Sequence, residues 1–143
     1  MIVRLSHMHH AVSNIDDTLK LYNDLWGLSA AKVVHFPDEG VSNALIPIGD
    51  NYIVVQEPSD PQGSLAKYIE KRGEGVRSIC LVSDDLEAET RALRAKGVEF
   101  WERTPTPSFP FGATWINPHH TRGILVMLAQ DPEIHDFMQK SYT

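Results

Sequence analysis

Apolar residues recur at three- and four-residue steps in two stretches of the chain, and this spacing is typical of helices with one buried face. The first stretch runs from Ile15 to Trp26, after an Asn or Asp that can cap it, and Gly27 ends it. The second starts at Leu86, after two aspartates, and ends at Gly97. The two patterns lie about 70 residues apart, which is longer than the period of solenoid repeats. We therefore expect two copies of one module.

Runs of β-branched and aromatic residues complete both modules. One run precedes each helix and three follow it, so that each module reads as βαβββ. The runs that follow the helices cover residues 29–36, 41–49 and 51–58 in the first module, and 97–102, 113–118 and 123–130 in the second.

These patterns predict one α+β domain over residues 1–143. Its first module covers about residues 1–60 and its second about 74–130. A connecting helix lies between them at about 61–73, and a short, partly frayed helix is expected in the tail at 131–143. A chain of 143 residues fits one domain of this kind.

Charge and cysteine content narrow the possible partners. The net charge is −6 and the basic residues are scattered, so we expect no nucleic acid partner. About 18 consecutive apolar residues would be needed to cross a bilayer. No such run occurs, so no membrane partner is expected. Cys80 is the only cysteine and cannot form an internal disulfide, which favours a cytoplasmic protein.

Four strings, in this order and at this spacing, resemble the vicinal oxygen chelate superfamily of glyoxalases, bleomycin-resistance proteins and dioxygenases. They are "SHMHHAVSNIDDTLKLYNDLWGL", "VVQEP" followed by "SLAKYIEKRGEG", "LVSDDLEAETRALRAKGVEF" and "INPHHTRGILVML". The methylmalonyl-CoA epimerase branch is the most similar. The resemblance implies paired βαβββ modules whose eight strands form an incomplete barrel, with a site inside the cup and a homodimer as the assembly.

The same resemblance implies four metal ligands, at positions that are His7, Val54, Ser78 and Met127 in this chain. Only His7 is a competent ligand, because valine has no donor atom, methionine is soft and a neutral serine hydroxyl binds poorly. We therefore predict no metal and no other cofactor. The epimerase's catalytic carboxylate falls at Asn43, whose amide cannot take a proton from carbon, so methylmalonyl-CoA epimerisation is not expected.

Strand alternation then gives the expected lining of the cup. Every second residue of a strand points to the same face, so His9 shares the face of His7, and Gln56 that of Val54. The polar lining is predicted to be His7, His9, Asn43, Gln56 and Ser78, against an apolar wall of Met127, Trp101, Phe111 and Trp115. His10 is predicted to point away into the packed layer. Such a mixed cup suits a small organic ligand with a few polar groups.

The two inward histidines favour a metal-independent enzyme that moves a proton on a small organic acid, thioester or ring-containing metabolite, as an isomerase, lyase, cyclase or hydrolase. His7 and His9 are the predicted acid/base pair. His7 is preferred because His9 is expected one pleat deeper. One alternative is a non-catalytic binding protein like the bleomycin-resistance proteins. Another is a metal-dependent epimerase or lyase with the substitute ligands His7, His9 and Gln56.

The segment from Thr104 to Gly112 contains three prolines and two phenylalanines, so it is expected to have no regular structure. Two interpretations stay open, a stiff aromatic lid over the site and a rigid surface connection. Asp38 and Glu39 are expected near the rim, where Glu39 has the reach to supply a carboxylate.

Overall fold

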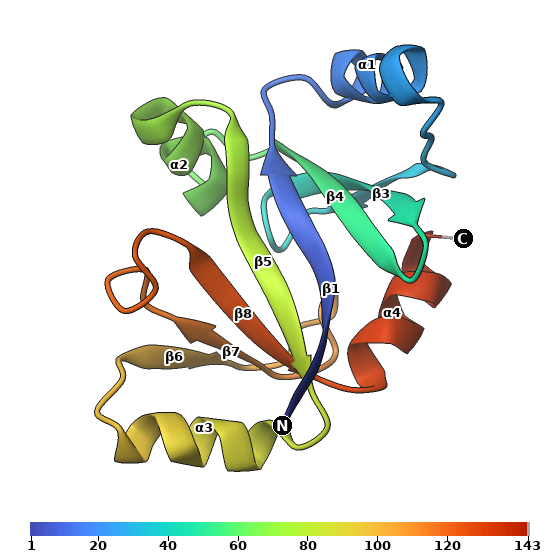
Figure 1. Cartoon of the computed structure of the whole chain (residues 1–143). Coiled ribbons are helices and arrows are strands. Elements are labelled where there is room, and N and C mark those ends of the chain that lie inside the picture. The colour runs from blue at the N-terminus through green and yellow to red at the C-terminus, as the bar shows by residue number, and fades with distance from the viewer. Residues whose placement is uncertain (143) are drawn as a thin grey trace.

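Eight strands form one open sheet in residues 1–142, which are the residues that the computed structural model describes (Figure 1). The strands are β1 (Ile2–Ala11), β2 (Val33–Phe36), β3 (Val41–Ile48), β4 (Asn51–Pro58), β5 (Gly75–Ser83), β6 (Phe100–Arg103), β7 (Ala113–Ile116) and β8 (Leu125–Gln130). The helices are α1 (Ile15–Trp26), α2 (Ser64–Arg72), α3 (Leu86–Ala95) and α4 (Glu133–Tyr142). The α+β class predicted from the sequence is confirmed.

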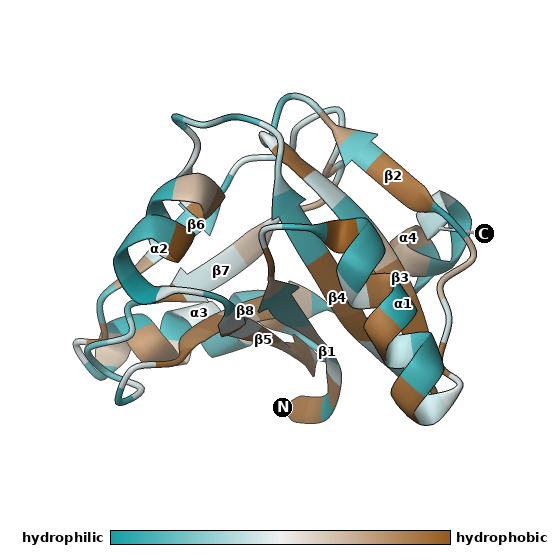
Figure 2. Cartoon of the chain, turned by 90° about the horizontal axis from the view of Figure 1, so that it is seen from above, coloured by the Kyte–Doolittle hydropathy of each residue, from teal (hydrophilic) through white to brown (hydrophobic). Residues whose placement is uncertain are grey.

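The strand order β2-β3-β4-β1-β5-β8-β7-β6 places the two modules side by side. In each module the first strand pairs in parallel with the last, β1 with β4 and β5 with β8. The modules join through the antiparallel pair of β1 and β5. Figure 2 shows the two halves of the sheet rising on either side of this central pair. The edge strands β2 and β6 do not pair with each other, so the barrel is incomplete, as expected.

Side-chain caps fix where the two module helices begin. The Asn14 side chain accepts a hydrogen bond from the Asp17 N–H at 3.0 Å, and Asp85 accepts one from Ala88 at 3.0 Å. Gly27 ends α1 with φ of 66°, a left-handed conformation that favours glycine. Both helices pack on the outer face of the sheet through small apolar clusters, which leaves the inner face for the cup. No helix of the described chain is long and apolar enough to cross a membrane.

The C-terminal helix α4 is part of the core, not a frayed tail. Ile134, Met138 and Tyr142 are buried and belong to the same cluster as Phe36 of β2 and residues of β8. These three residues are four positions apart, so they form one apolar stripe along the helix. The expectation of fraying was wrong because this stripe, although present in the sequence, is covered only when both modules have folded.

Candidate functional site

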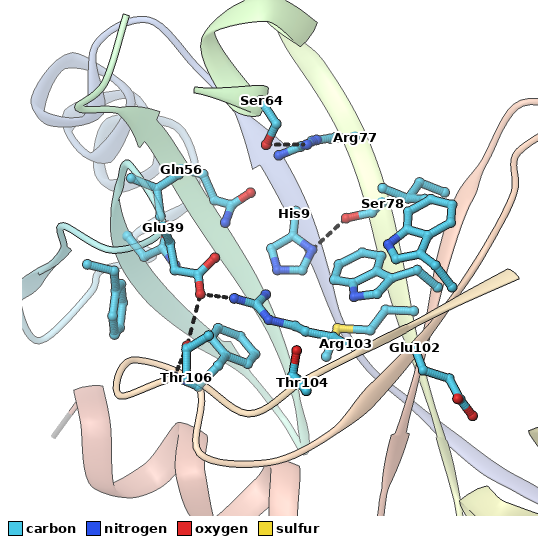
Figure 3. A pocket seen from close by; sticks show the side chains of 18 residues that line it. His9, Glu39, Gln56, Ser64, Arg77, Ser78, Glu102, Arg103, Thr104 and Thr106 are labelled. Carbon is cyan, nitrogen blue, oxygen red and sulfur yellow. Dashed lines mark hydrogen bonds and ion pairs between the residues drawn. The ribbon is translucent and has the colours of Figure 1, made fainter. Parts of the chain in front are cut away.

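A pocket of about 490 Å³ lies on the inner face of the sheet, between its two halves. Strands of both modules contribute to it, and so does the segment 104–112 (Figure 3). Its polar side chains are His9, Glu39, Asn43, Gln56, Ser64, Arg77, Ser78, Glu102, Arg103, Thr104 and Thr106. Its apolar wall is made of Phe36, Val41, Trp101, Phe109, Trp115, Leu125 and Met127. The predicted combination of an apolar body and a few polar groups is therefore present.

His9 is the imidazole that reaches this pocket. It is 6% exposed, and its Nδ1 forms a 2.6 Å hydrogen bond with the hydroxyl of Ser78 on the neighbouring strand β5 (Figure 3). Burial lowers the pKa of His9 well below 6.5, and the neighbouring His7 and Arg77 lower it further. The ring is therefore neutral at neutral pH, and Ser78 fixes its orientation.

His7 does not line the pocket, and the prediction that His9 lies deeper than His7 was wrong. It is 1% exposed and lies against His9, with the two rings edge to face and their centroids 4.7 Å apart. Its Nδ1 is hydrogen-bonded to the Ser6 hydroxyl at 3.0 Å. Burial, with a smaller effect of Arg4, lowers the pKa of His7 to about 3. Alternation correctly placed both histidines on the inner face, but the depth order of the two is the reverse of the predicted one.

The other predicted lining residues separate into two groups. Gln56, Ser78, Met127, Trp101 and Trp115 line the pocket as expected. Phe111 does not, because it is buried against Phe109 and Phe137, with ring centroids 5.0 and 5.1 Å away. Its predicted place in the pocket wall was therefore wrong. Phe109 takes that place in the wall.

Asn43 lines the pocket next to Gln56, its register partner across β3 and β4. Its amide Nδ2 donates to the Tyr142 hydroxyl at 3.1 Å, so the C-terminal helix holds this side chain. Its Oδ1 is buried, and no group within residues 1–142 donates to it. Asn43 therefore offers a fixed amide and no carboxylate.

Two residues with nucleophilic or titratable side chains lie outside the site. His10 points to the outer layer, as predicted, and its Nδ1 is hydrogen-bonded to the Tyr22 hydroxyl of α1 at 2.9 Å. Cys80 is fully buried, and burial raises the pKa of its thiol to about 12. Neither side chain lines the pocket.

Arg77 is a lining residue that the sequence analysis missed. Simple alternation puts the residue before Ser78 on the opposite face. The register of β1 and β5 is interrupted here, since His9 pairs with Ser78 and His10 with Val76, and the Arg77 side chain lines the pocket beside α2 (Figure 3). The guanidinium donates to the Ser64 hydroxyl at 3.4 Å and lies 5.4 Å from the centroid of the Tyr68 ring. Tyr68 lies nine residues before Arg77 in the chain, and this spacing is not a sequence motif that predicts a contact.

The second missed arginine, Arg103, closes the other side of the pocket. It forms an ion pair with Glu39, and its guanidinium lies 4.4 Å from the Phe109 ring centroid. Thr106 also donates to Glu39, at 3.1 Å. Glu39 does reach inward, as the sequence analysis considered.

The segment 104–112 is thereby connected to the turn before β3. Besides the contacts of Glu39, Ser108 donates to Asp38 through its backbone N–H at 3.2 Å and through its hydroxyl. Thr104, Thr106 and Phe109 line the pocket. Of the two interpretations left open, the structure favours a wall over the site, held in place by side-chain contacts.

The residues present do not fit the metal implied by the fold. Of the positions that the resemblance assigns to metal ligands, Val54 and Met127 belong to the buried core, and Ser78 is hydrogen-bonded to His9. Within residues 1–142 no three His, Cys, Asp or Glu side chains converge. In the substitute set, the Nδ1 atoms of His7 and His9 already bond serine hydroxyls, and Gln56 is a neutral amide. An imidazole-carboxylate site for Zn²⁺ or a similar ion is therefore not built here.

The profile of the glyoxalase/bleomycin resistance protein/dioxygenase superfamily matches residues 6–112. The chain belongs to this superfamily. Among curated relatives, the mitochondrial methylmalonyl-CoA epimerase of Dictyostelium discoideum is 24% identical over 135 residues, which cover 90% of this chain and 79% of that protein. The uncharacterized protein YqjC of Bacillus subtilis is 26% identical over 132 residues, which cover 89% of this chain and 91% of that protein.

Solved structures of epimerases in the superfamily have the same fold. The Streptomyces coelicolor methylmalonyl-CoA epimerase in complex with 2-nitronate-propionyl-CoA superposes with a TM-score of 0.81 at 24% identity, covering 92% of this chain and 96% of that one. The methylmalonyl-CoA epimerase of Mycobacterium tuberculosis gives 0.79 at 26% identity, covering 94% and 93%. The epimerase-like resemblance stated from the sequence strings is confirmed.

Proposed function

We propose that this protein is a metal-independent isomerase or lyase that transfers a proton on a small organic acid or acyl thioester, with His9 as the acid/base group. The observation that carries the proposal is the hydrogen bond of 2.6 Å between His9 and Ser78 at the wall of a polar and aromatic pocket. An imidazole held by a hydroxyl and facing a cavity is a common arrangement for a general base.

The choice of reaction class rests on the relatives. Several of them are methylmalonyl-CoA epimerases by name, and one solved epimerase holds a propionyl-CoA derivative. Isomerisation of this kind needs a base to take a proton next to a carbonyl and an acid to return it. Asn43 occupies the position that the resemblance assigns to a carboxylate, and an amide cannot do this. Glu39 is bound by Arg103 and Thr106, so His9 is the remaining base.

In the proposed mechanism the two ring nitrogens of His9 have different roles. When Nδ1–H donates to the Ser78 oxygen, the lone pair lies on Nε2, which takes the proton from substrate carbon. Because the pKa of His9 is low, the imidazolium formed is a strong acid and returns the proton readily. The Gln56 amide, on the adjacent strand β4, is proposed to donate to the oxygen on which charge develops. The metal-independent part of the proposal rests on the unsuitable donor set described above.

Proton exchange tests the proposal without knowledge of the final product. Methylmalonyl-CoA and other short acyl thioesters are incubated in D₂O with the protein, and deuterium at the α-carbon is followed by NMR. We expect exchange that falls on the order of 10²–10⁴-fold in His9→Gln, with little change in affinity. His10→Gln, on the outer layer, is the matched control and should exchange like the native protein.

A His7 variant adds a second comparison to the deuterium exchange experiment. Because its pKa is about 3 and it does not line the pocket, His7→Gln should reduce exchange far less than His9→Gln. Equal exchange in the native protein and His9→Gln would contradict the acid/base assignment.

A binding protein is the second candidate, and the wall of Trp101, Phe109 and Trp115 favours it, since aromatic surfaces hold ring-bearing ligands without chemistry. A bound ligand that is recovered unchanged and without deuterium would support this candidate.

A further inference from the structure

Arg77 is a cation of the pocket that no carboxylate balances. None of the ion pairs formed within residues 1–142 involves it, and its only hydrogen bond from a side chain is the 3.4 Å contact with the neutral hydroxyl of Ser64. The Tyr68 ring covers one side of the guanidinium at 5.4 Å. Burial lowers the pKa of Arg77, which is the expected effect when a cation loses water and gains no anion.

The other charges of the pocket are already compensated. Arg103 pairs with Glu39, and Glu102 pairs with Arg94 at 3.7 Å. His9 is neutral because burial and its neighbours keep its pKa low. The positive charge of Arg77 is therefore not compensated in the pocket, and a ligand with one negative charge would complement it.

The start of α2 adds to this positive potential. Ser64 is the first residue of this nine-residue helix, and Gly63 before it provides no side-chain cap. The first N–H groups of a helix favour an anion. The Asp60 carboxylate lies in the turn before α2, where it accepts from the Gln62 N–H at 2.9 Å, and Ser64 lies beside the guanidinium at the pocket (Figure 3). An arginine and a hydroxyl next to such an end form a receptor for a planar oxyanion.

We propose that Arg77 and Ser64 bind a carboxylate of the ligand at the α2 end of the pocket, so that the protein takes monoanionic carboxylates with an apolar body. This inference rests on the proposed function in one respect, namely that this pocket is the active site. The apolar body lies against Trp101, Trp115 and Phe109 on the opposite wall. A bound carboxylate also neutralises the positive charge that faces His9, so the imidazole accepts a proton more readily in the complex than in the free protein.

Matched aromatic probes test the charge preference. The full chain, labelled with ¹⁵N, is titrated with 3-phenylpropanoate, with its uncharged analogue 3-phenylpropanamide, and with phenyl phosphate, and affinities are read from NMR shifts. We expect the carboxylate to bind about tenfold or more tightly than the amide, since a charge-assisted pair is about twice as strong as a neutral one. Phenyl phosphate, a dianion near neutral pH, should bind less tightly than the carboxylate.

Two variants of Arg77 test whether this residue causes the preference for the carboxylate over the amide. Arg77→Gln should abolish the preference for the carboxylate, and Arg77→Lys should keep part of it. The control is Arg72→Gln, because Arg72 lies 6.0 Å from the same Tyr68 ring but is exposed and does not line the pocket. Equal binding of carboxylate and amide to the native protein would overturn the proposal. So would equal weakening by Arg77→Gln and Arg72→Gln, or tighter binding of the phosphate.

The proposed function can fail separately. His9→Gln should retain the carboxylate preference, because His9 is not part of the anion site. If deuterium exchange is absent but the preference is present, the function is wrong and the anion site stands. If exchange depends on His9 and the preference is absent, the anion site is wrong and the function stands.

Discussion

The buried His7 makes a quantitative prediction for stability in acid. The residue is 1% exposed inside the inner layer, with its Nδ1 bonded to the Ser6 hydroxyl, and burial lowers its pKa from 6.5 to about 3. The unfolded chain therefore binds a proton at this residue between these two pH values, while the folded chain does not. Stability from neutral His7 is complete above pH 6.5 and is lost as the pH falls towards 3.

The magnitude follows from the shift itself. Each pKa unit corresponds to about 1.4 kcal/mol, so protonation of His7 in the unfolded chain costs about 2 to 3 kcal/mol of unfolding free energy between pH 7 and pH 4.5. His7→Gln cannot take up this proton. The variant should therefore lose about 2 to 3 kcal/mol less than the native protein over the same interval, whatever its stability at pH 7.

Urea unfolding followed by tryptophan fluorescence at several pH values measures this difference. His119→Gln is the control, because His119 is exposed in the turn before β8 and lies outside the inner layer. The reasoning is refuted if the native protein and His7→Gln lose the same free energy between pH 7 and pH 4.5.

Three further predictions concern the metal, the assembly and the wall of the pocket. Elemental analysis of protein purified without chelator should find no stoichiometric transition metal; about one ion per chain, lost on His7→Ala, would instead support the substitute ligand set. Light scattering at micromolar concentration should report the dimer proposed from the sequence, since Ile2, Val3 and Leu5 expose apolar surface along β1; a monomer would count against it. Glu39→Gln should remove the ion pair with Arg103 and speed amide hydrogen exchange in segment 104–112. Glu70→Gln, a change at an exposed residue of α2, should leave the exchange rate of this segment unchanged. An unchanged exchange rate in both variants would show that the ion pair does not hold the segment.

The sequence largely predicted which residues face the cup. It did not predict how deeply each of them is buried below the pocket. Alternation placed His7 and His9 on one face because side-chain direction has a period of two on any strand. It gives no depth, because depth depends on what covers each end of the strand. Here the core closes over His7 and leaves His9 at the pocket. The same limit explains Phe111, which α4 covers through Phe137.

The sequence by itself determined the two modules and their helix boundaries, because periodicity and capping residues are local properties. The lack of metal donors at Val54, Ser78 and Met127 stays a prediction, because the ligand positions come from the family resemblance. The charges of the site were decided only in the tertiary structure. Arg77 lines the pocket at a break in the register of β1 and β5, and Arg103 meets Glu39 across more than sixty residues of chain. Strand register and contacts between modules depend on how the two halves of the sheet meet, and no spacing within the chain encodes that.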